Sequence, residues 1–170
     1  MSDDAEILAL HRLKSRYFRF LDTKDWARWR ELFTDDLVFY IEATMLPTTT
    51  EPTTVGGDEF VEYVSNLLRT STTVHHGHMP DLELLDGRTA RGIWAMYDWV
   101  DDLEGNRAIQ GWGHYHERYE KGADGAWRIA ELRLTRLRVD AVQPTPPPAD
   151  RRFPAPSWKR DQRPAAGTTS

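Results

Sequence analysis

The sequence predicts an α+β fold in which N-terminal helices pack on one face of an antiparallel sheet. Segments with helical periodicity occupy the first part of the chain, and strand-like segments joined by short turns follow from about residue 82. This order, helices first and hairpin-linked strands second, is typical of the class. The chain has 170 residues, of which 39% are apolar, so it can form one hydrophobic core.

Three segments of the first part are predicted to be helices. Residues 4–22 carry apolar side chains at mostly three- and four-residue steps, with charged residues between them. Asp25 is a suitable N-cap for a short second helix over residues 26–33. Asp58 is expected to cap a third helix, whose apolar residues form one stripe.

The strands are predicted from β-rich composition and from the turns that bound them. A turn is expected at residues 34–36, and a polar loop rich in Thr and Pro is expected at residues 47–57. Later turns are marked by Gly together with Asp or Asn. The predicted strands cover residues 37–41, 82–85, 89–100, 108–119 and 127–139.

Composition divides the chain into a domain at residues 1–142 and a basic C-terminal tail at residues 143–170. Seven of the ten prolines lie from Pro144 onward, so the tail is expected to be disordered or to pack on a neighbouring subunit. From Pro144 the net charge is +3, which leaves −8 for the rest and argues against a nucleic-acid partner. There is no cysteine, no apolar run of membrane-spanning length and no signal sequence, so a cytoplasmic location is expected without a membrane partner.

Three of the six histidines lie within residues 75–78, and the pattern leaves several interpretations open. Imidazole can exchange a proton near neutral pH, so the segment could be a proton-transfer site. In an extended segment, His76 and His78 point to one face and His75 to the other. A metal bound by His76, His78 and His116 is disfavoured, because no carboxylate lies at a suitable spacing. A histidine that only satisfies a backbone carbonyl is the simplest alternative.

Two acidic residues are ambiguous on pattern alone. Asp22 lies where the first helix ends, and it could pair with another group, face solvent or cap the next turn. Tyr17 lies about 140° away from it on a regular helix, so the spacing does not place both in one site. Asp98 shares a strand face with Trp94 and Met96, which could line a cavity, but it could equally begin an acidic turn. There is no phosphate-binding glycine loop, no GxSxG and no HExxH motif.

The order of these segments resembles that of the NTF2-like superfamily, and within it the SnoaL-like group. Four short segments are similar to the corresponding segments of bacterial bile acid 7α-dehydratases, and the likeness covers roughly residues 5–140. These segments are Tyr17–Asp22, His75–Pro80, Thr89–Gly92 with Asp98, and Tyr119–Lys121 followed by Trp127. The resemblance implies a curved antiparallel sheet wrapped around the helices, forming a cone-shaped barrel with an apolar pocket.

The resemblance also implies roles for individual residues. It makes Tyr17, Asp22, His75 and Asp98 catalytic, with Arg136 in support. The pocket is expected to include Phe18, Trp94, Met96, Trp112, His78 and His114. Trp112 and His114 depart from the dehydratase pattern, and the loop at residues 47–57 looks longer, so the shape of the pocket is expected to differ.

The expected function is that of a cofactor-independent acid–base lyase, a dehydratase for a hydrophobic polycyclic or steroid-like substrate. A cyclase, isomerase or dehydrohalogenase of the same fold is the alternative, because one base can serve several reactions. A non-catalytic module that binds a small molecule is the other. Apolar and aromatic residues opposite the expected pocket (Ile93, Tyr97 and Trp99) suggest a homodimer or homotrimer.

Overall fold

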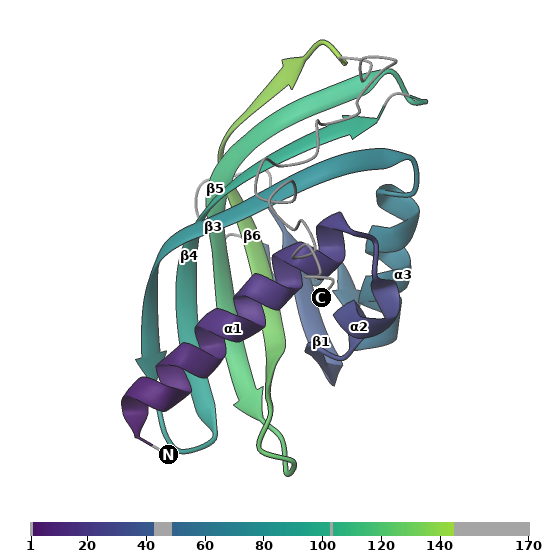
Figure 1. Ribbon diagram of the computed structural model, residues 1–170. Helices are drawn as coiled ribbons and strands as arrows, with labels where there is room; N and C mark the ends of the chain where they lie inside the picture. The colour runs from purple at the N-terminus through teal and green to yellow at the C-terminus, as the bar shows by residue number, and fades with distance from the viewer. Residues whose placement is uncertain (1, 43–48, 103, 145–170) are drawn as a thin grey trace, which may run out of the picture.

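The computed structural model describes residues 2–42, 49–102 and 104–144, and it confirms the α+β class. In Figure 1 the helices lie beside one long, curved sheet. The helices are α1 (Asp3–Asp22), α2 (Trp26–Arg30) and α3 (Gly57–Leu67). The strands are β1 (Phe33–Ile41), β2 (Thr54–Val55), β3 (Ser71–Leu84), β4 (Thr89–Asp102), β5 (Arg107–Lys121) and β6 (Trp127–Val142).

The sheet has the strand order β2-β1-β6-β5-β4-β3. Strands β3 to β6 form an antiparallel meander. The expected wholly antiparallel sheet needs one correction, because β1 pairs with β6 in parallel. Parallel neighbours require a long connection, and here α3 and the first three strands of the meander separate β1 from β6.

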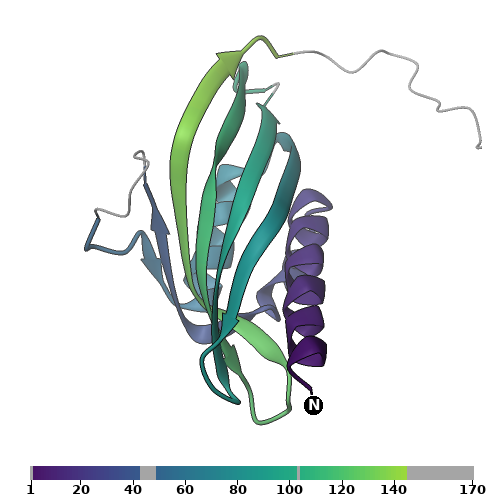
Figure 2. The ribbon, with the colours of Figure 1, turned by 90° about the vertical axis from the view of Figure 1, so that its left-hand side faces the viewer.

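The helices cover one face of the sheet and bury the core against it. In Figure 1, α1 crosses in front of the meander, while α2 and α3 lie beside β1. In Figure 2, α1 runs beside β3 and α3 is partly hidden behind the strands, so no helix of the described residues covers the face turned to the viewer. Leu10 and Leu13 of α1 are buried, as are Ile129 and Leu132 of β6, so the apolar stripe of α1 packs into the concave face.

Several element boundaries differ from the predicted ones. Residues 34–36 lie inside β1 and not in a turn, and the pairing of β1 with β6 is irregular between Phe33 and Val38. Gly56, and not Asp58, is the N-cap of α3. The largest difference is β3, which begins at Ser71 and therefore contains the whole histidine segment. Asp25 caps α2 as predicted, since its side chain accepts a hydrogen bond from the backbone N–H of Arg28.

Some predictions fall wholly or partly outside the described residues. Of the predicted tail, residues 145–170 are outside them, and so are the first residues of the loop expected at 47–57. No helix in the described part of the chain is long and apolar enough to cross a membrane.

Candidate functional site

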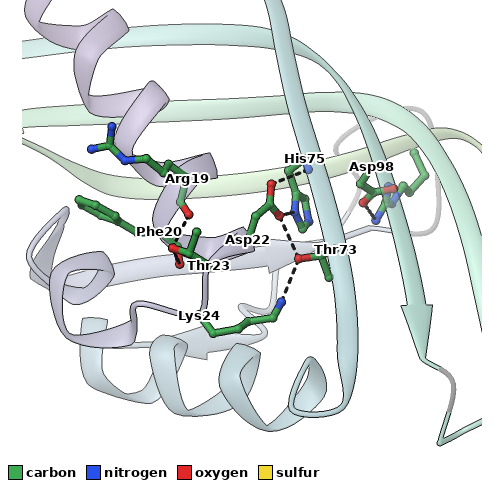
Figure 3. Close-up of polar contacts among 9 residues, drawn as sticks. Arg19, Phe20, Asp22, Thr23, Lys24, Thr73, His75 and Asp98 are labelled. Carbon is green, nitrogen blue, oxygen red and sulfur yellow. Dashed lines mark hydrogen bonds and ion pairs between the residues drawn. The ribbon is translucent and has the colours of Figure 1, made fainter. Parts of the chain in front are cut away.

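A carboxylate–imidazole pair joins the end of α1 to β3. The Asp22 Oδ1 atom lies 2.7 Å from His75 Nδ1, and Asp22 Oδ2 accepts a hydrogen bond of 2.9 Å from the backbone N–H of His75. Figure 3 shows the carboxylate facing the imidazole ring. The hydrogen bond from the backbone N–H of His75 ties the Asp22 carboxylate to β3. The backbone therefore helps to fix the distance between the carboxylate and the imidazole. Of the meanings that the pattern left open for Asp22, the structure selects the paired one.

Two further side chains fix the carboxylate. Thr73 Oγ1 donates a hydrogen bond of 2.9 Å to Asp22 Oδ1, and it accepts one of 2.9 Å from Lys24 Nζ (Figure 3). Burial lowers the pKa of Lys24, and the nearby Asp22 charge raises it. A carboxylate oxygen is an acceptor, so its contact with His75 Nδ1 selects the tautomer that carries its hydrogen on Nδ1 and leaves the lone pair on Nε2. Among the described residues, Nε2 has no hydrogen-bond partner.

His75 lines a cavity of about 270 Å³ between the helices and the sheet. Only 8% of His75 is exposed. Most of the lining is apolar, and α3, its C-cap Leu68, β1 and β6 contribute Phe39, Phe60, Val64, Leu68 and Leu132 to it. Its polar lining residues include Tyr17, His75, Asp98, Tyr115 and Arg136, together with Ser71, Asp102 and Arg107. An apolar cavity with a few convergent polar groups is the usual form of a small-molecule site.

A buried ion pair lies beside the imidazole. Asp98 pairs with His75 in the register of β3 and β4, and it is 2% exposed. Both of its carboxylate oxygens accept from Arg136, at 2.9 Å from Nη1 and 2.8 Å from Nη2. Asp98 lies within β4, so it does not begin a turn. A bidentate pair of this kind is strong and directional, so it fixes the guanidinium in the cavity wall.

Two tyrosines complete the polar part of the cavity. Tyr17 of α1 and Tyr115 of β5 are each 3% exposed, and their ring centroids are 5.9 Å apart. Burial is the main cause that raises the pKa of Tyr17 well above its usual value, and the neighbouring Tyr115 and Glu117 raise it further. Burial, followed by the Asp98 charge, also raises the pKa of Tyr115. Both phenols therefore stay protonated at neutral pH and can donate hydrogen bonds.

A family model described as a SnoaL-like domain matches residues 4–133. The chain belongs to the SnoaL-like domain family. "Probable cyclase FGR4" of Gibberella zeae is 24% identical over 134 residues, which cover 75% of this chain and 89% of that protein. These matches confirm the expected family membership.

Two solved structures match this SnoaL-like chain in fold. The crystal structure of a hexachlorocyclohexane dehydrochlorinase, LinA type 2, has a TM-score of 0.72 at 23% identity and covers 86% of this chain and 96% of its own. A Novosphingobium aromaticivorans protein, provisionally assigned as a scytalone dehydratase, has a TM-score of 0.68 at 16% identity, with coverage of 86% and 95%. At these identities the two structures show the fold, and they confirm the expected NTF2-like architecture.

None of the six side chains expected around the pocket is among those that line this cavity. Trp94 and Met96 are buried on the expected face, but they lie farther along β4, where His11 of α1 packs edge-on against Trp94. Phe18 is also used for packing, because its ring lies where a side chain on Gly77 would be. The cavity of this SnoaL-like domain therefore lies under α3 and the C-terminal end of α1, and not where the first part of α1 packs against Trp94.

The other three expected pocket residues lie on the opposite face of the sheet. His78 of β3 and His114 of β5 both pair with Ala95 of β4. The neighbours of Ala95, Trp94 and Met96, are buried on the concave face, so Ala95 and the two histidines are on the other face. Trp112 contacts Tyr97, with ring centroids 5.5 Å apart. Strand alternation therefore takes these side chains away from the cavity.

His76 and His78 share a face, as the extended segment predicted, with ring centroids 6.3 Å apart. His116 lies on β5, where its Nε2 is 3.2 Å from Thr135 Oγ1. The described ranges contain no group of three or more His, Cys, Asp or Glu residues that could hold a metal ion.

Tyr115 is one of the cavity residues that the sequence analysis missed, and it matters because of its hydroxyl group. It lies on β5 opposite Trp94 of β4 and two residues after Gly113. The alternation of Gly111, Gly113 and Tyr115 on one face is a usable signal, since small residues leave room in front of a large one. The alternation is visible in the sequence, but which face of the strand meets the cavity is not.

Gly111 gives room to the ion pair, which leads to a prediction. A Cβ atom at this position would lie 2.3 Å from both Arg136 Nη1 and Asp98 Oδ1. We expect Gly111→Ala to force these side chains apart, costing about 1–3 kcal/mol of stability and about tenfold to a hundredfold of any activity. Thermal unfolding and kinetics would measure the two effects. Gly87→Ala is the matched control, because a Cβ atom there meets no atom within 4 Å.

The buried phenols lead to a pH prediction. Tyr17, Tyr115 and Tyr119 have pKa values raised mainly by burial, so near-ultraviolet absorbance should show them ionising only when the chain unfolds. The folded state then binds more protons than the unfolded state at alkaline pH, and the free energy of unfolding falls as pH rises. Lys14 and Lys24, whose pKa values burial lowers, act in the opposite direction, but only below the ordinary lysine value of 10.5. Stability should therefore fall above about pH 10.5. Complete tyrosine ionisation in the folded protein would contradict this.

Proposed function

We propose that this chain is a cofactor-independent lyase that removes a proton and a neighbouring hydroxyl group from a hydrophobic cyclic substrate. One observation carries the proposal: the free Nε2 atom of His75 belongs to an imidazole that lines an apolar cavity and is held by Asp22 at Nδ1. A positioned imidazole whose other nitrogen is fixed by a carboxylate is a general base.

In the proposed reaction, His75 Nε2 takes a proton from a carbon atom next to a carbonyl group. The C–H electron pair forms the new C=C bond and the adjacent C–O bond breaks. The imidazolium gives the proton that it took from carbon to the departing hydroxyl, which leaves as water, and His75 is neutral again. Asp22 stabilises the imidazolium while it carries the positive charge, and such transfers contribute about 10²–10⁴-fold.

The phenols of Tyr17 and Tyr115 are the proposed donors to the oxygen on which negative charge develops. The resemblance implies that Asp98 is catalytic, and an acid at this position could protonate the leaving group. The bidentate contact with Arg136 supports a different role, because the guanidinium occupies both carboxylate oxygens of Asp98. In this proposal Asp98 positions Arg136, and the phenols donate.

The cavity supports a compact substrate. Its volume of about 270 Å³ lies near the lower end of the range of roughly 300–1,000 Å³ for ligand pockets. Its walls are largely aliphatic and aromatic, so a ring system with few polar substituents fits best. Among the polycyclic substrates suggested by the sequence, this volume favours small ones over a steroid with a long side chain.

The named relatives support a second candidate, a dehydrohalogenase or cyclase that uses the same base. A dehydrochlorinase and a cyclase are among the proteins that this chain resembles. Loss of chloride needs a base but no proton for the leaving group, and cyclisation needs a base and an oxyanion site. The two phenols favour a reaction in which an oxygen gains charge.

Product analysis would test these candidates. The full chain would be incubated with cyclic β-hydroxyketones of one to three rings and with a polychlorinated cyclohexane, and products would be identified by mass spectrometry. Dehydration removes the mass of one water, dehydrochlorination removes that of HCl, and cyclisation or isomerisation leaves the mass unchanged. Binding of ketones without turnover of any compound would contradict the proposed lyase and support a binding module.

A further inference from the structure

Lys14 of α1 is a charged residue inside the core that the proposed reaction does not use. It is 1% exposed, and Glu117 of β5 is its one hydrogen-bond acceptor among the described residues. The Glu117 side chain is fully buried as well. Burial lowers the pKa of Lys14, and the adjacent Glu117 charge opposes this effect.

Glu117 connects the lysine to a buried hydrogen-bond chain. Its second oxygen accepts a hydrogen bond from the Tyr119 hydroxyl. That hydroxyl in turn accepts a hydrogen bond of 2.8 Å from Trp94 Nε1. Each polar side-chain atom of this hydrogen-bond chain therefore has a partner. The chain links Glu117 to α1 through Lys14, to Tyr119 within β5, and through Tyr119 to Trp94 of β4.

The ammonium group lies against the two phenols of the cavity. Lys14 Nζ is 3.7 Å from the ring centroid of Tyr115 and 4.1 Å from that of Tyr17. The ring of Phe18 is also near, at 4.8 Å. The N–H groups of Lys14 that do not donate to Glu117 are therefore surrounded by aromatic rings and not by water. A cation over an aromatic face is held by the electrostatic field of the ring, and the attraction is stronger when the contact is desolvated.

A gain in the stability of the folded chain does not by itself explain why an ion pair is buried here. Moving two charges out of water costs about as much as their attraction returns, and apolar replacements of similar volume are often at least as stable. The position of the pair gives a better reason. Lys14 lies over the rings of both tyrosines that line the cavity, and it brings a positive charge to them.

We propose that the Lys14–Glu117 ion pair is a positioning element of the site, which holds Tyr17 and Tyr115 in place and strengthens their binding of an oxyanion in the cavity. The inference rests on the proposed function, in which these phenols bind the developing negative charge. The Glu117 charge raises the pKa of Tyr17 and Tyr115, but the pair turns its positive end to the two rings, so the ammonium offsets that charge and favours donation by the O–H groups. It also limits the tilt of both rings, so the two hydroxyl groups keep their directions.

An oxyanion probe that needs no turnover would test this inference. β-Naphthol is a compact two-ring phenol, and its fluorescence distinguishes the neutral from the ionised form. The double variant Lys14→Met/Glu117→Gln removes both charges with little change in volume. We expect the ionisation constant of bound β-naphthol to fall by about tenfold in this variant, while the affinity for naphthalene changes less than about twofold. For any substrate that is turned over, kcat should fall while KM stays nearly constant.

The chain offers a matched control. Lys121 and Glu6 form a second lysine–glutamate pair, at 2.6 Å, which also receives a tryptophan N–H, from Trp127. These residues do not line the cavity. We expect Lys121→Met/Glu6→Gln to leave β-naphthol ionisation unchanged. If Lys14→Met/Glu117→Gln does not fold, Lys14→Gln/Glu117→Gln keeps an amide contact and provides the same measurement.

Each outcome bears on the inference. An unchanged ionisation constant in the folded double variant would show that the ion pair is only structural and would overturn the proposal. Failure of β-naphthol to bind the wild-type chain would also overturn it, since two phenol donors must accept such a ligand. Absence of turnover with every compound, together with the expected tenfold effect on β-naphthol, would contradict the lyase function but support the positioning role.

Discussion

Replacement of His75 by Ala should nearly abolish turnover, with a decrease in kcat of about 10²–10⁴-fold. The reason is that Nε2 of His75 is the proposed proton acceptor, and no other imidazole is among the residues that line the cavity. His75→Gln, which retains more of the side-chain volume, should show a similar loss. Steady-state kinetics on the substrate found by product analysis would measure both, and circular dichroism would confirm that the variants fold.

His76→Ala is the control for this prediction. His76 is adjacent in sequence but lies on the opposite face of β3, where it contacts His78 and Tyr97. Its removal should change kcat by less than about twofold, because surface substitutions away from a site have small effects. If His75→Ala stayed within a few-fold of wild type, the imidazole would not be the base and the proposed mechanism would be wrong.

The elements predicted correctly are those whose pattern is local. The predicted start of helix α1 lies within one residue of the observed start, because its apolar periodicity is clear over 20 residues. Strand β3 is predicted only at residues 82–85 but begins at Ser71. Its first half alternates buried Ser71, Thr73 and His75 with exposed residues, so polar side chains occupy the positions that the pattern expects to be apolar. A strand whose buried face is a functional site lacks the usual signal.

The residues of the site were predictable to different extents. The resemblance brought Tyr17, Asp22, His75, Asp98 and Arg136 together, and the structure places four of them in the wall of one cavity with Asp22 bound to His75. The cavity wall could not be predicted in the same way. Its extent depends on which half of the sheet α1 covers, and this is set by the packing of helix on sheet and not by a local pattern.

The Lys14–Glu117 pair was beyond sequence analysis for another physical reason. On a helical pattern, Lys14 reads as one of the charged residues between apolar ones, and solvent is the default environment of a lysine. Its burial depends on a carboxylate 103 residues later in the chain and on rings from α1 and β5. Such a long-range arrangement becomes visible only when the strands are in register.

Replacement of Asp22 by Asn should reduce kcat by about 10²–10⁴-fold, nearly as much as loss of the imidazole. The carboxylate accepts at Oδ2 from the backbone N–H of His75 and at Oδ1 from His75 Nδ1 and Thr73 Oγ1. An amide has one oxygen, and the backbone N–H can only donate, so the oxygen of the introduced amide must face that N–H. The amide NH₂ group then faces His75 Nδ1 and donates to it. The imidazole is driven to the tautomer that carries its proton on Nε2, which cannot act as a base.

Nuclear magnetic resonance of the imidazole nitrogens would detect the change of tautomer directly, and kinetics would measure its consequence. Asp25→Asn is the matched control, because Asn also serves as an N-cap and Asp25 has no contact with the cavity. The double variant Asp22→Asn/His75→Ala should lose little beyond His75→Ala, since the two residues act as a unit. Additive losses would show that Asp22 acts on the substrate independently of His75, and an unchanged tautomer with full activity would remove the dyad from the mechanism.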